Sequence, residues 1–162
     1  MQQTHIVHPI APLYDKNSRI LILGSFPSVK SREQGFYYGH PQNRFWPLLA
    51  RILDEPVPVT IEQKKALLLS HGIALWDAIY SCDIMGSSDS SIRNAVPTDL
   101  KGILETSQIS RIFCNGSSAG RCFEKYQEKA LGMKAMVLPS TSPANAAWSL
   151  DRLYEVWKSI LA

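Results

Sequence analysis

The sequence predicts an α/β fold built on a four-stranded parallel sheet. Four short apolar runs alternate with segments of helical periodicity, and turn residues follow each run. Continuous apolar runs are typical of strands that helices cover on both faces, and strands that alternate with helices pair in parallel through right-handed crossovers. The expected strands are residues 19–24, 73–76, 111–114 and 135–138.

The segments between these runs predict the helices and loops. Thr60 and Gln63 have the spacing of a capping box, and Thr98 is a candidate cap for a short helix. Residues 1–18 contain Pro9 and Pro12 and are expected to be irregular. The expected helices are residues 46–53, 60–70, 98–104, 118–130 and 149–161, and the expected long loops are residues 25–45 and 81–97.

Length and composition fit one globular domain over residues 1–162. Of the 162 residues, 45% are hydrophobic and 19% are charged, and no repeat or linker interrupts them. The net charge of +3 is compatible with a polyanionic partner, but many solvated surfaces carry such a balance. No signal peptide is evident, and no apolar run approaches the roughly 20 residues that cross a bilayer. We therefore expect a cytoplasmic protein without a membrane partner.

Several kinds of chemistry have no support in the sequence. The three cysteines are widely spaced without a C-x-x-C pair, and the four histidines show no metal-ligand spacing. We therefore expect unreactive buried thiols and no metal site. The chain also lacks a G-x-S-x-G nucleophile elbow and a Walker lysine, which argues against those forms of nucleophilic and phosphoryl-transfer chemistry.

The unusual polar clusters all follow predicted strands. They are Gly24–Ser28, Asp77, Asn115–Ser118 and Pro139–Asn145. The carboxyl ends of parallel strands meet at one edge of a sheet, and ligands of open α/β folds bind at that edge. The sequence therefore predicts a single site assembled from these four clusters.

The loop after the first strand has the composition of a base-binding loop. Aromatic side chains stack on nucleobases and contribute about 1–3 kcal/mol per base. The candidates for stacking are Phe26, Phe36, Tyr37 and Tyr38. Phe45 and Trp46 are instead expected to enter the core as the next helix begins. The Asn43 amide has both a donor and an acceptor, so it can read a base edge or hold a water molecule, and a loop-capping amide is the alternative.

Hydroxyl residues at two of the clusters suggest phosphate binding. Ser117 and Ser118 begin a helix, where free backbone N–H groups bind anions, and helix capping is the alternative role for both. Ser140, Thr141 and Ser142 add hydroxyl groups in a loop bounded by two prolines. Such small polar residues commonly contact the phosphates of nucleic acids.

These residues form motifs that resemble a known family. The motif blocks are Gly24–Ser28, His40–Trp46, Leu75–Asp77, Gly86–Ile92 and Leu138–Asn145. In this order, over nearly the whole chain, they resemble the uracil-DNA glycosylase superfamily, and most closely its hypoxanthine (deoxyinosine) DNA glycosylase branch. The resemblance implies a three-layer α/β/α sandwich around the four-stranded parallel sheet. It also implies removal of a flipped base by water attack, without a cofactor or a metal.

The chain departs from this family at two positions. Where uracil enzymes have an aspartate or asparagine that positions the attacking water, this chain has Phe26. Where they commonly have a histidine that polarises a base carbonyl, it has Leu138. The resemblance to the hypoxanthine branch therefore assigns the catalytic role to Asn43. Asp77 matches a base-reading position, and as a carboxylate it can accept an N–H group of hypoxanthine.

The resemblance also assigns residues to base and DNA binding. The first motif is expected to line the base pocket with Gly24, Ser25, Phe26, Pro27 and Ser28. The loop after the fourth strand is expected to press into the minor groove with Ser140, Thr141, Ser142, Pro143, Ala144 and Asn145. Arg44 is a candidate phosphate contact, as are Lys30, Arg32 and Arg93, and for each of them a solvated surface charge is the alternative.

The function expected from these observations is that of a monofunctional DNA glycosylase in base excision repair. It would hydrolyse the N-glycosidic bond of hypoxanthine, with uracil or xanthine as further substrates, as a monomer acting on DNA. Two alternatives stay open. One is a non-catalytic binder of damaged nucleic acid, which the loss of two usual catalytic residues would suit. The other is a hydrolase of free nucleosides or nucleotides.

Overall fold

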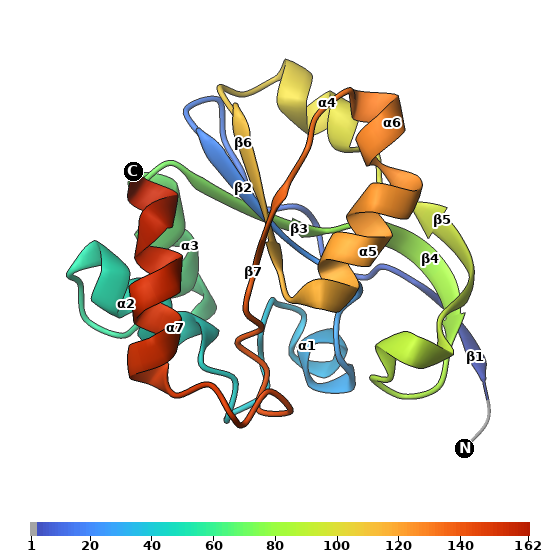
Figure 1. Ribbon diagram of the computed structural model, residues 1–162, viewed down its shortest axis with the longest axis horizontal. Helices are drawn as coiled ribbons and strands as arrows, with labels where there is room; N and C mark the ends of the chain where they lie inside the picture. The colour runs from blue at the N-terminus through green and yellow to red at the C-terminus, as the bar shows by residue number, and fades with distance from the viewer. Residues whose placement is uncertain (1–2) are drawn as a thin grey trace.

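The computed structural model describes residues 3–162 and contains the expected parallel sheet (Figure 1). The strand order is β3-β2-β6-β7. The strands are β2 (Ile20–Gly24), β3 (Ile73–Asp77), β6 (Arg111–Asn115) and β7 (Met136–Leu138). In the register of the sheet, Gly24 lies opposite Asp77, and Asn115 lies opposite Leu138. The carboxyl ends of the four strands therefore lie at one edge of the sheet, as the sequence predicted.

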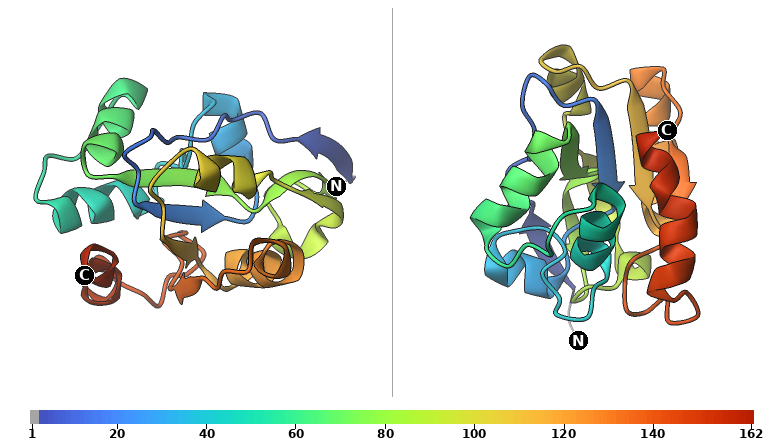
Figure 2. Two further views of the ribbon diagram at one scale, coloured as in Figure 1. Left: turned by 90° about the horizontal axis from the view of Figure 1, so that it is seen from above. Right: turned by 90° about the vertical axis from the view of Figure 1, so that its left-hand side faces the viewer.

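Helices cover both faces of this sheet and make it the middle layer of a three-layer sandwich, which confirms the predicted fold class (Figures 1 and 2). Ile20 and Ile22 of β2 pack in one cluster, and Leu21 and Leu23 pack in another, as the two-residue period of a strand requires. The first face is covered by α2 (Phe45–Leu53), α3 (Ile61–Ser70), α7 (Leu150–Trp157) and the 3-10 turn η2 (Lys158–Leu161). The second face is covered by α4 (Leu100–Glu105), α5 (Ser117–Tyr126) and α6 (Glu128–Leu131).

The first face contains the largest core side chains. Phe45 and Trp46 stack with ring centroids 4.9 Å apart, and Trp157 of α7 packs against Phe45. Full burial of a large apolar side chain stabilises a fold by about 1.5–3 kcal/mol. The predicted core position of Phe45 and Trp46 is confirmed, and this packing anchors the start of α2 directly after Asn43. The Thr60–Gln63 capping box is also present at the start of α3.

A second, antiparallel sheet occupies two segments that the sequence predicted to be irregular, residues 1–18 and 81–97. It has the order β1-β4-β5 and consists of β1 (Thr4–Val7), β4 (Ile79–Ile84) and β5 (Arg93–Pro97). β1 lies in the segment expected to be irregular, and β4 and β5 lie largely in the expected loop 81–97. Both outer strands are short and largely exposed, so they lack the burial pattern that marks a strand in a sequence.

A short helix, α1 (Val29–Gln34), interrupts the expected loop 25–45. The Ser28 side chain caps it by accepting the Ser31 N–H, and Gly35 ends it in the left-handed conformation with φ of 72°. The 3-10 turn η1 (Asp89–Ser91) similarly interrupts the expected loop before β5. Within residues 3–162, no helix is both long and apolar enough to span a membrane.

Candidate active site

A cavity of about 190 Å³ opens where β2, β3 and β6 end. Its volume is below the ~300–1,000 Å³ of sites for drug-sized ligands, which suits a single nucleobase. The predicted clusters after all four strands contribute to its wall. The lining residues are Gly24, Ser25, Phe26, Pro27, Ser28, Ser31, Tyr37, Tyr38, Asn43, Asp77, Ser87, Asp89, Asn115, Ser140, Thr141 and Ser142.

Gly24 allows the Asp77 carboxylate to reach the floor of the cavity. A Cβ atom at position 24 would lie 2.4 Å from Asp77 Oδ1, a separation that real Cβ contacts essentially never show. Asp77 is itself 4% exposed. A glycine is therefore required where β2 ends, because the neighbouring strand places a carboxylate oxygen in the space of a side chain.

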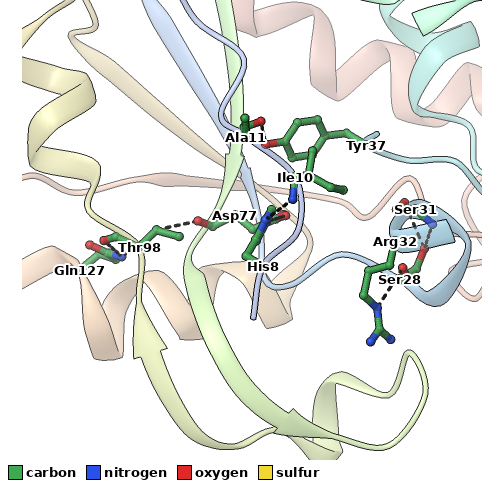
Figure 3. A network of polar contacts seen from close by, with 10 residues as sticks. All are labelled: His8, Ile10, Ala11, Ser28, Ser31, Arg32, Tyr37, Asp77, Thr98 and Gln127. Atoms are coloured by element: carbon green, nitrogen blue, oxygen red, sulfur yellow. Dashed lines mark hydrogen bonds and ion pairs between the residues drawn. The ribbon is translucent and has the colours of Figure 1, made fainter. Parts of the chain in front are cut away.

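His8 holds the other oxygen of this carboxylate (Figure 3). His8 Nε2 lies 2.7 Å from Asp77 Oδ2, and both side chains are almost completely buried. His8 Nδ1 accepts the Ile10 backbone N–H over 3.2 Å. Because Nδ1 is an acceptor, the hydrogen-bond network assigns the proton to Nε2, which donates it to Asp77. Asp77 Oδ1 accepts no hydrogen bond within the described chain and faces the cavity.

A second polar layer supports the backbone of Asp77 from behind. The Thr98 hydroxyl donates to the Asp77 carbonyl oxygen over 2.7 Å, and Gln127 Nε2 donates to the Thr98 carbonyl oxygen over 3.0 Å (Figure 3). Thr98 was expected to cap the following helix, but the structure corrects this. Asp99 is the N-cap residue of α4, and its side chain accepts the Gly102 N–H.

Asn43 lies at the cavity wall with a fixed orientation. Its Oδ1 accepts the Phe45 backbone N–H over 2.9 Å and the Thr141 hydroxyl over 2.8 Å. Both lone pairs of the amide oxygen are therefore occupied, and the Nδ2 group makes no hydrogen bond to residues 3–162. The cavity thus receives hydrogen-bond donors from Asn43. The capping role considered for Asn43 is present, and it orients the same amide that borders the cavity.

Thr141 joins Asn43 to the end of β6. The Thr141 hydroxyl accepts a hydrogen bond from Asn115 Nδ2 over 3.0 Å, and Asn115 Oδ1 accepts the Thr141 N–H over 3.0 Å. Thr141 is 0% exposed. The structure therefore places this residue inside the site as an orienting hydroxyl, whereas the sequence suggested a contact with DNA.

The four predicted stacking aromatics separate into cavity and core. Phe26, Tyr37 and Tyr38 line the cavity. Phe36 is corrected to a core residue, because it is 5% exposed and stacks on Trp46 with ring centroids 6.0 Å apart. Burial raises the pKa of both Tyr37 and Tyr38 above its ordinary value, and the negative charge of Asp77 adds to the shift.

Arg44, which was expected to contact DNA phosphate, is bound to the protein backbone. Its Nη2 group donates to the carbonyl oxygens of Ser142 and Asn145 over 2.8 and 3.1 Å. Its Nε and Nη1 groups donate to the carbonyl oxygens of Thr141 and Trp148. Buried loop carbonyls need partners, and one guanidinium supplies four of them here. Arg44 therefore fixes the loop that follows β7.

Ser117 and Ser118 lie in a wider groove beside the cavity, together with Asn115, Ser140 and Asn145. The N-cap residue of α5 is Gly116, without a side-chain cap, so the capping alternative for the two serines is not observed. Gly116 has φ of 96°, and a Cβ atom there would lie 3.0 Å from Ser140 Cβ. Close approach of these two segments therefore places both hydroxyl clusters on one groove.

The rest of the predicted DNA loop forms a rim. Pro143 is half-buried, Ala144 is exposed, and Asn145 Nδ2 donates to the Ser140 carbonyl oxygen over 3.0 Å. Across the groove, Asp89 of η1 borders the cavity. Asp89 is exposed as a residue, but desolvation of its carboxyl end raises its pKa, while the nearby Ser25, Arg121 and Ser118 side chains act in the opposite direction.

The cysteines have the properties expected of unreactive thiols. Burial raises the pKa of Cys82 and Cys122 to about 11 and that of Cys114 to about 12. A thiol becomes a nucleophile only as the thiolate, so all three are poor nucleophiles near neutral pH. Within residues 3–162, no group of three or more His, Cys, Asp or Glu side chains is arranged to hold a metal ion.

Comparisons with known proteins agree with this architecture. Residues 11–161 match the sequence profile of the uracil DNA glycosylase superfamily. The chain belongs to the uracil DNA glycosylase superfamily. It is 37% identical over 150 residues to the hypoxanthine DNA glycosylase of Methanosarcina acetivorans, a match that covers 90% of this chain and 92% of that protein. It is 30% identical over 138 residues to the hypoxanthine DNA glycosylase of Methanosarcina barkeri, covering 83% and 85%.

Superfamily membership also agrees with the structural comparison. A solution NMR structure of a uracil DNA glycosylase-like protein from Methanosarcina acetivorans superposes with a TM-score of 0.81 at 33% identity, covering 96% of this chain and 97% of that one. The sequence analysis placed Asn115 in one of the four polar clusters without assigning it a role, and it did not select His8. Asn115 followed a predicted strand, which was an available signal. His8 had none, because its contact with Asp77 depends on the unpredicted β1–β4 pairing.

Proposed function

We propose that this DNA glycosylase removes hypoxanthine from deoxyinosine in DNA. The observation that carries the proposal is the Asn43 amide. Two hydrogen bonds fix it at the wall of a nucleobase-sized cavity, in the position where the sequence resemblance expected the catalytic group. Two relatives at 37% and 30% identity are named hypoxanthine DNA glycosylases, which supports the same substrate here.

The proposed reaction needs the damaged nucleotide outside the duplex. Flipping removes base pairing and stacking at a cost of a few kcal/mol, which is lowest for a damaged or mispaired base. The bond between C1′ and N9 then breaks, its electron pair leaves with the base, and the sugar becomes oxocarbenium-like. A water oxygen adds to C1′ and loses a proton to solvent, and the departing hypoxanthine anion takes up a proton from solvent. The products are free hypoxanthine and an abasic site.

In this scheme, Asn43 holds the attacking water. Its Nδ2 group donates a hydrogen bond to the water oxygen, because Oδ1 is already occupied by Phe45 and Thr141. Phe26, at the position where uracil enzymes have a polar residue, lines the cavity but has no polar group to offer. The Asp77 carboxylate faces the base. The groove with Ser117, Ser118 and Ser140 is the proposed phosphate-binding surface beside this cavity.

The experiment is a glycosylase assay on duplexes that contain inosine, uracil, xanthine or a thymine mismatch. We expect abasic sites from inosine, and we expect Asn43→Ala to lower the single-turnover rate by about 10²–10³-fold, as for the loss of a preorganised polar group. Asn17→Ala is the matched control, since Asn17 is an exposed amide near the amino end of β2. Full activity of Asn43→Ala would exclude the proposed role. Binding of inosine DNA without abasic product would identify a non-catalytic binder instead.

A further inference from the structure

The Tyr38 hydroxyl is a buried polar group whose proton has no acceptor among residues 3–162. Its oxygen is almost completely inaccessible to solvent. The Asn115 side chain donates toward this oxygen and acts to lower the pKa of Tyr38, but it does not accept the hydroxyl proton. Buried hydroxyl groups are nearly always paired, so an unpaired one at a cavity wall indicates a missing partner. Because burial raises the pKa of Tyr38 above its ordinary value, the group stays a neutral O–H donor.

The backbone at Tyr38 is also held in an uncommon conformation. Its φ is 53°, in the left-handed region that few residues other than glycine adopt. Such conformations persist where the surroundings over-determine them, and they are concentrated at ligand sites. Here the ring packs edge-on against Phe45 with ring centroids 4.1 Å apart. The Tyr38 side chain is therefore fixed by packed structure at the cavity wall.

The Tyr38 oxygen and the free oxygen of Asp77 border the same point of the cavity floor. A Cβ atom placed on Gly24 would lie 2.4 Å from Asp77 Oδ1 and 3.4 Å from the Tyr38 hydroxyl oxygen. Among residues 3–162, the Tyr38 hydroxyl is a donor without an acceptor, and Asp77 Oδ1 is an acceptor without a donor. His8 fixes the second of them by holding Asp77 Oδ2 over 2.7 Å (Figure 3).

An adjacent donor and acceptor complement the edge of a lactam. Hypoxanthine presents an N1–H donor beside a C6=O acceptor, whereas adenine presents an N1 lone pair beside an amino group. A carboxylate that faces the N1 lone pair of adenine leaves both acceptors unpaired, which strongly disfavours binding. Deamination converts the second pattern into the first, so such a pair distinguishes the damaged base from its parent.

We propose that the Tyr38 hydroxyl and Asp77 Oδ1 bind the O6 and N1–H edge of the base, with His8 as the positioning residue that orients Asp77. The proposal rests on the proposed function and adds two specificity-determining residues to it. A donor at O6 also stabilises the negative charge that develops on the leaving base. His8 precedes residues 11–161, the part of the chain that matches the superfamily profile, and β1 places it.

Tyr38→Phe tests the donor, since it removes only the hydroxyl. Single-turnover excision is measured for deoxyinosine and for deoxynebularine, whose purine base lacks both O6 and N1–H, in one duplex context. We expect the deoxyinosine rate to fall roughly 10–100-fold and the deoxynebularine rate to change by less than about 3-fold, as for one hydrogen bond made in the transition state. Tyr126→Phe, a tyrosine on α5 outside the cavity, is the matched control. Equal loss on both substrates would overturn the assignment, as would an unchanged deoxyinosine rate.

His8→Phe and His8→Gln test the positioning role. The phenylalanine variant keeps a ring but loses the donor, so the preference for deoxyinosine over deoxynebularine should collapse. The glutamine variant keeps an N–H donor and should restore most of that preference. Thermal melting verifies that each variant is folded at the assay temperature. A folded His8→Phe variant that keeps the wild-type preference would overturn the role of His8, as would equal loss in both variants.

A binding measurement separates this proposal from the proposed function. Free hypoxanthine should raise the melting temperature of the wild-type protein, adenine should not, and Tyr38→Phe should reduce the hypoxanthine effect. If wild-type protein forms no abasic sites in inosine DNA, the proposed function fails. The melting measurement still decides whether Tyr38 and Asp77 bind the O6 and N1–H edge of the base. Equal stabilisation by both bases, or by neither, would overturn it.

Discussion

The Thr141 hydroxyl donates a hydrogen bond to Asn43 Oδ1 over 2.8 Å, although the two residues are 98 positions apart in the chain. Asn115 Nδ2 donates to the same hydroxyl over 3.0 Å. The loop before α2, the end of β6 and the loop after β7 are thereby joined through one oxygen atom. The orientation of the proposed catalytic amide consequently depends on a residue outside its own motif.

Removing the Thr141 hydroxyl should slow excision while leaving the shape of the cavity nearly unchanged. Thr141→Val is nearly isosteric, but it leaves Asn43 and Asn115 each without one hydrogen bond. We expect about 1–3 kcal/mol of lost stability from the unpaired buried groups. We also expect a single-turnover rate on deoxyinosine about 10–100-fold lower, because a misplaced catalytic group loses its alignment. Thr141→Ser keeps the hydroxyl and should remain near wild type. Equal rates for the valine and serine variants would contradict an orienting role.

Gly24 should tolerate no side chain. A Cβ atom there would lie 2.4 Å from Asp77 Oδ1, so Gly24→Ala must displace the carboxylate that His8 holds. We expect a loss of about 1–3 kcal/mol from overpacking and a nearly complete loss of excision. Gly102→Ala is the matched control, because its Cβ would meet only the side chain of Asp99, at 3.3 Å, and alanine is about 1 kcal/mol better than glycine within a helix. An active Gly24→Ala enzyme would show that Asp77 is dispensable.

Arg44→Lys distinguishes a loop anchor from a phosphate contact. Lysine keeps the charge but cannot reach four carbonyl oxygens in a planar fork. With hydrogen bonds to charged groups contributing about 1.5–3 kcal/mol each, we expect a stability loss of about 2–4 kcal/mol in denaturant unfolding. In a folded Arg44→Ala variant, which loses the charge, the salt dependence of DNA binding should be unchanged. Wild-type stability for Arg44→Ala, together with a salt slope reduced by about 1, would instead indicate a direct phosphate contact.

Asp89 should make stability depend on pH. Its pKa is raised in the folded protein, mainly by desolvation of the carboxyl end, so its protonated form is favoured by folding. Because the residue as a whole is exposed, solvent screening makes this effect small. The resulting stability is fully present below the unfolded value of about 3.9 and is lost as pH rises through the folded value. Asp89→Asn should therefore melt above wild type at pH 7, with the difference shrinking toward pH ~4.

The same substitution should strengthen DNA binding, because it removes a negative charge that borders the groove with Ser117 and Ser118. Melting curves between acidic and neutral pH and a titration with duplex DNA provide the two measurements. A wild-type protein that is more stable than Asp89→Asn at pH 7 would show that Ser25 and Arg121 together stabilise the carboxylate more than desolvation destabilises it.

Local patterns in the sequence were sufficient for the parallel sheet and for most of the cavity wall. The run Ile20–Leu23 is apolar on both sides, and such a run has few alternatives to a buried strand. Once the strands were assigned, parallel pairing brought Gly24 and Asp77 to one edge. The family motifs then identified Asn43. None of these steps required knowledge of side-chain contacts.

Residues whose partners are distant in sequence were assigned less well. Arg44 looked like a surface cation, and only the folded loop after β7 shows that its donors are occupied. Thr141 looked like a phosphate contact for the same reason. Phe36 was grouped with the cavity aromatics, but α2 places Trp46 so that its indole stacks on the Phe36 ring. Composition alone cannot tell which face of an aromatic loop is buried.

The sequence by itself determined the strand order along the chain, the edge at which the polar clusters meet, and the superfamily. Apolar periodicity and motif spacing are properties of residues that are close in sequence. Because the apolar side chains must be buried, such patterns are compatible with few alternative structures. Only the tertiary structure decided that His8 holds Asp77, that Thr141 orients Asn43, and that the Tyr38 hydroxyl proton has no acceptor within residues 3–162. Each of these depends on hydrogen-bond geometry between segments far apart in the chain, and that geometry exists only after the two sheets and the loops have packed.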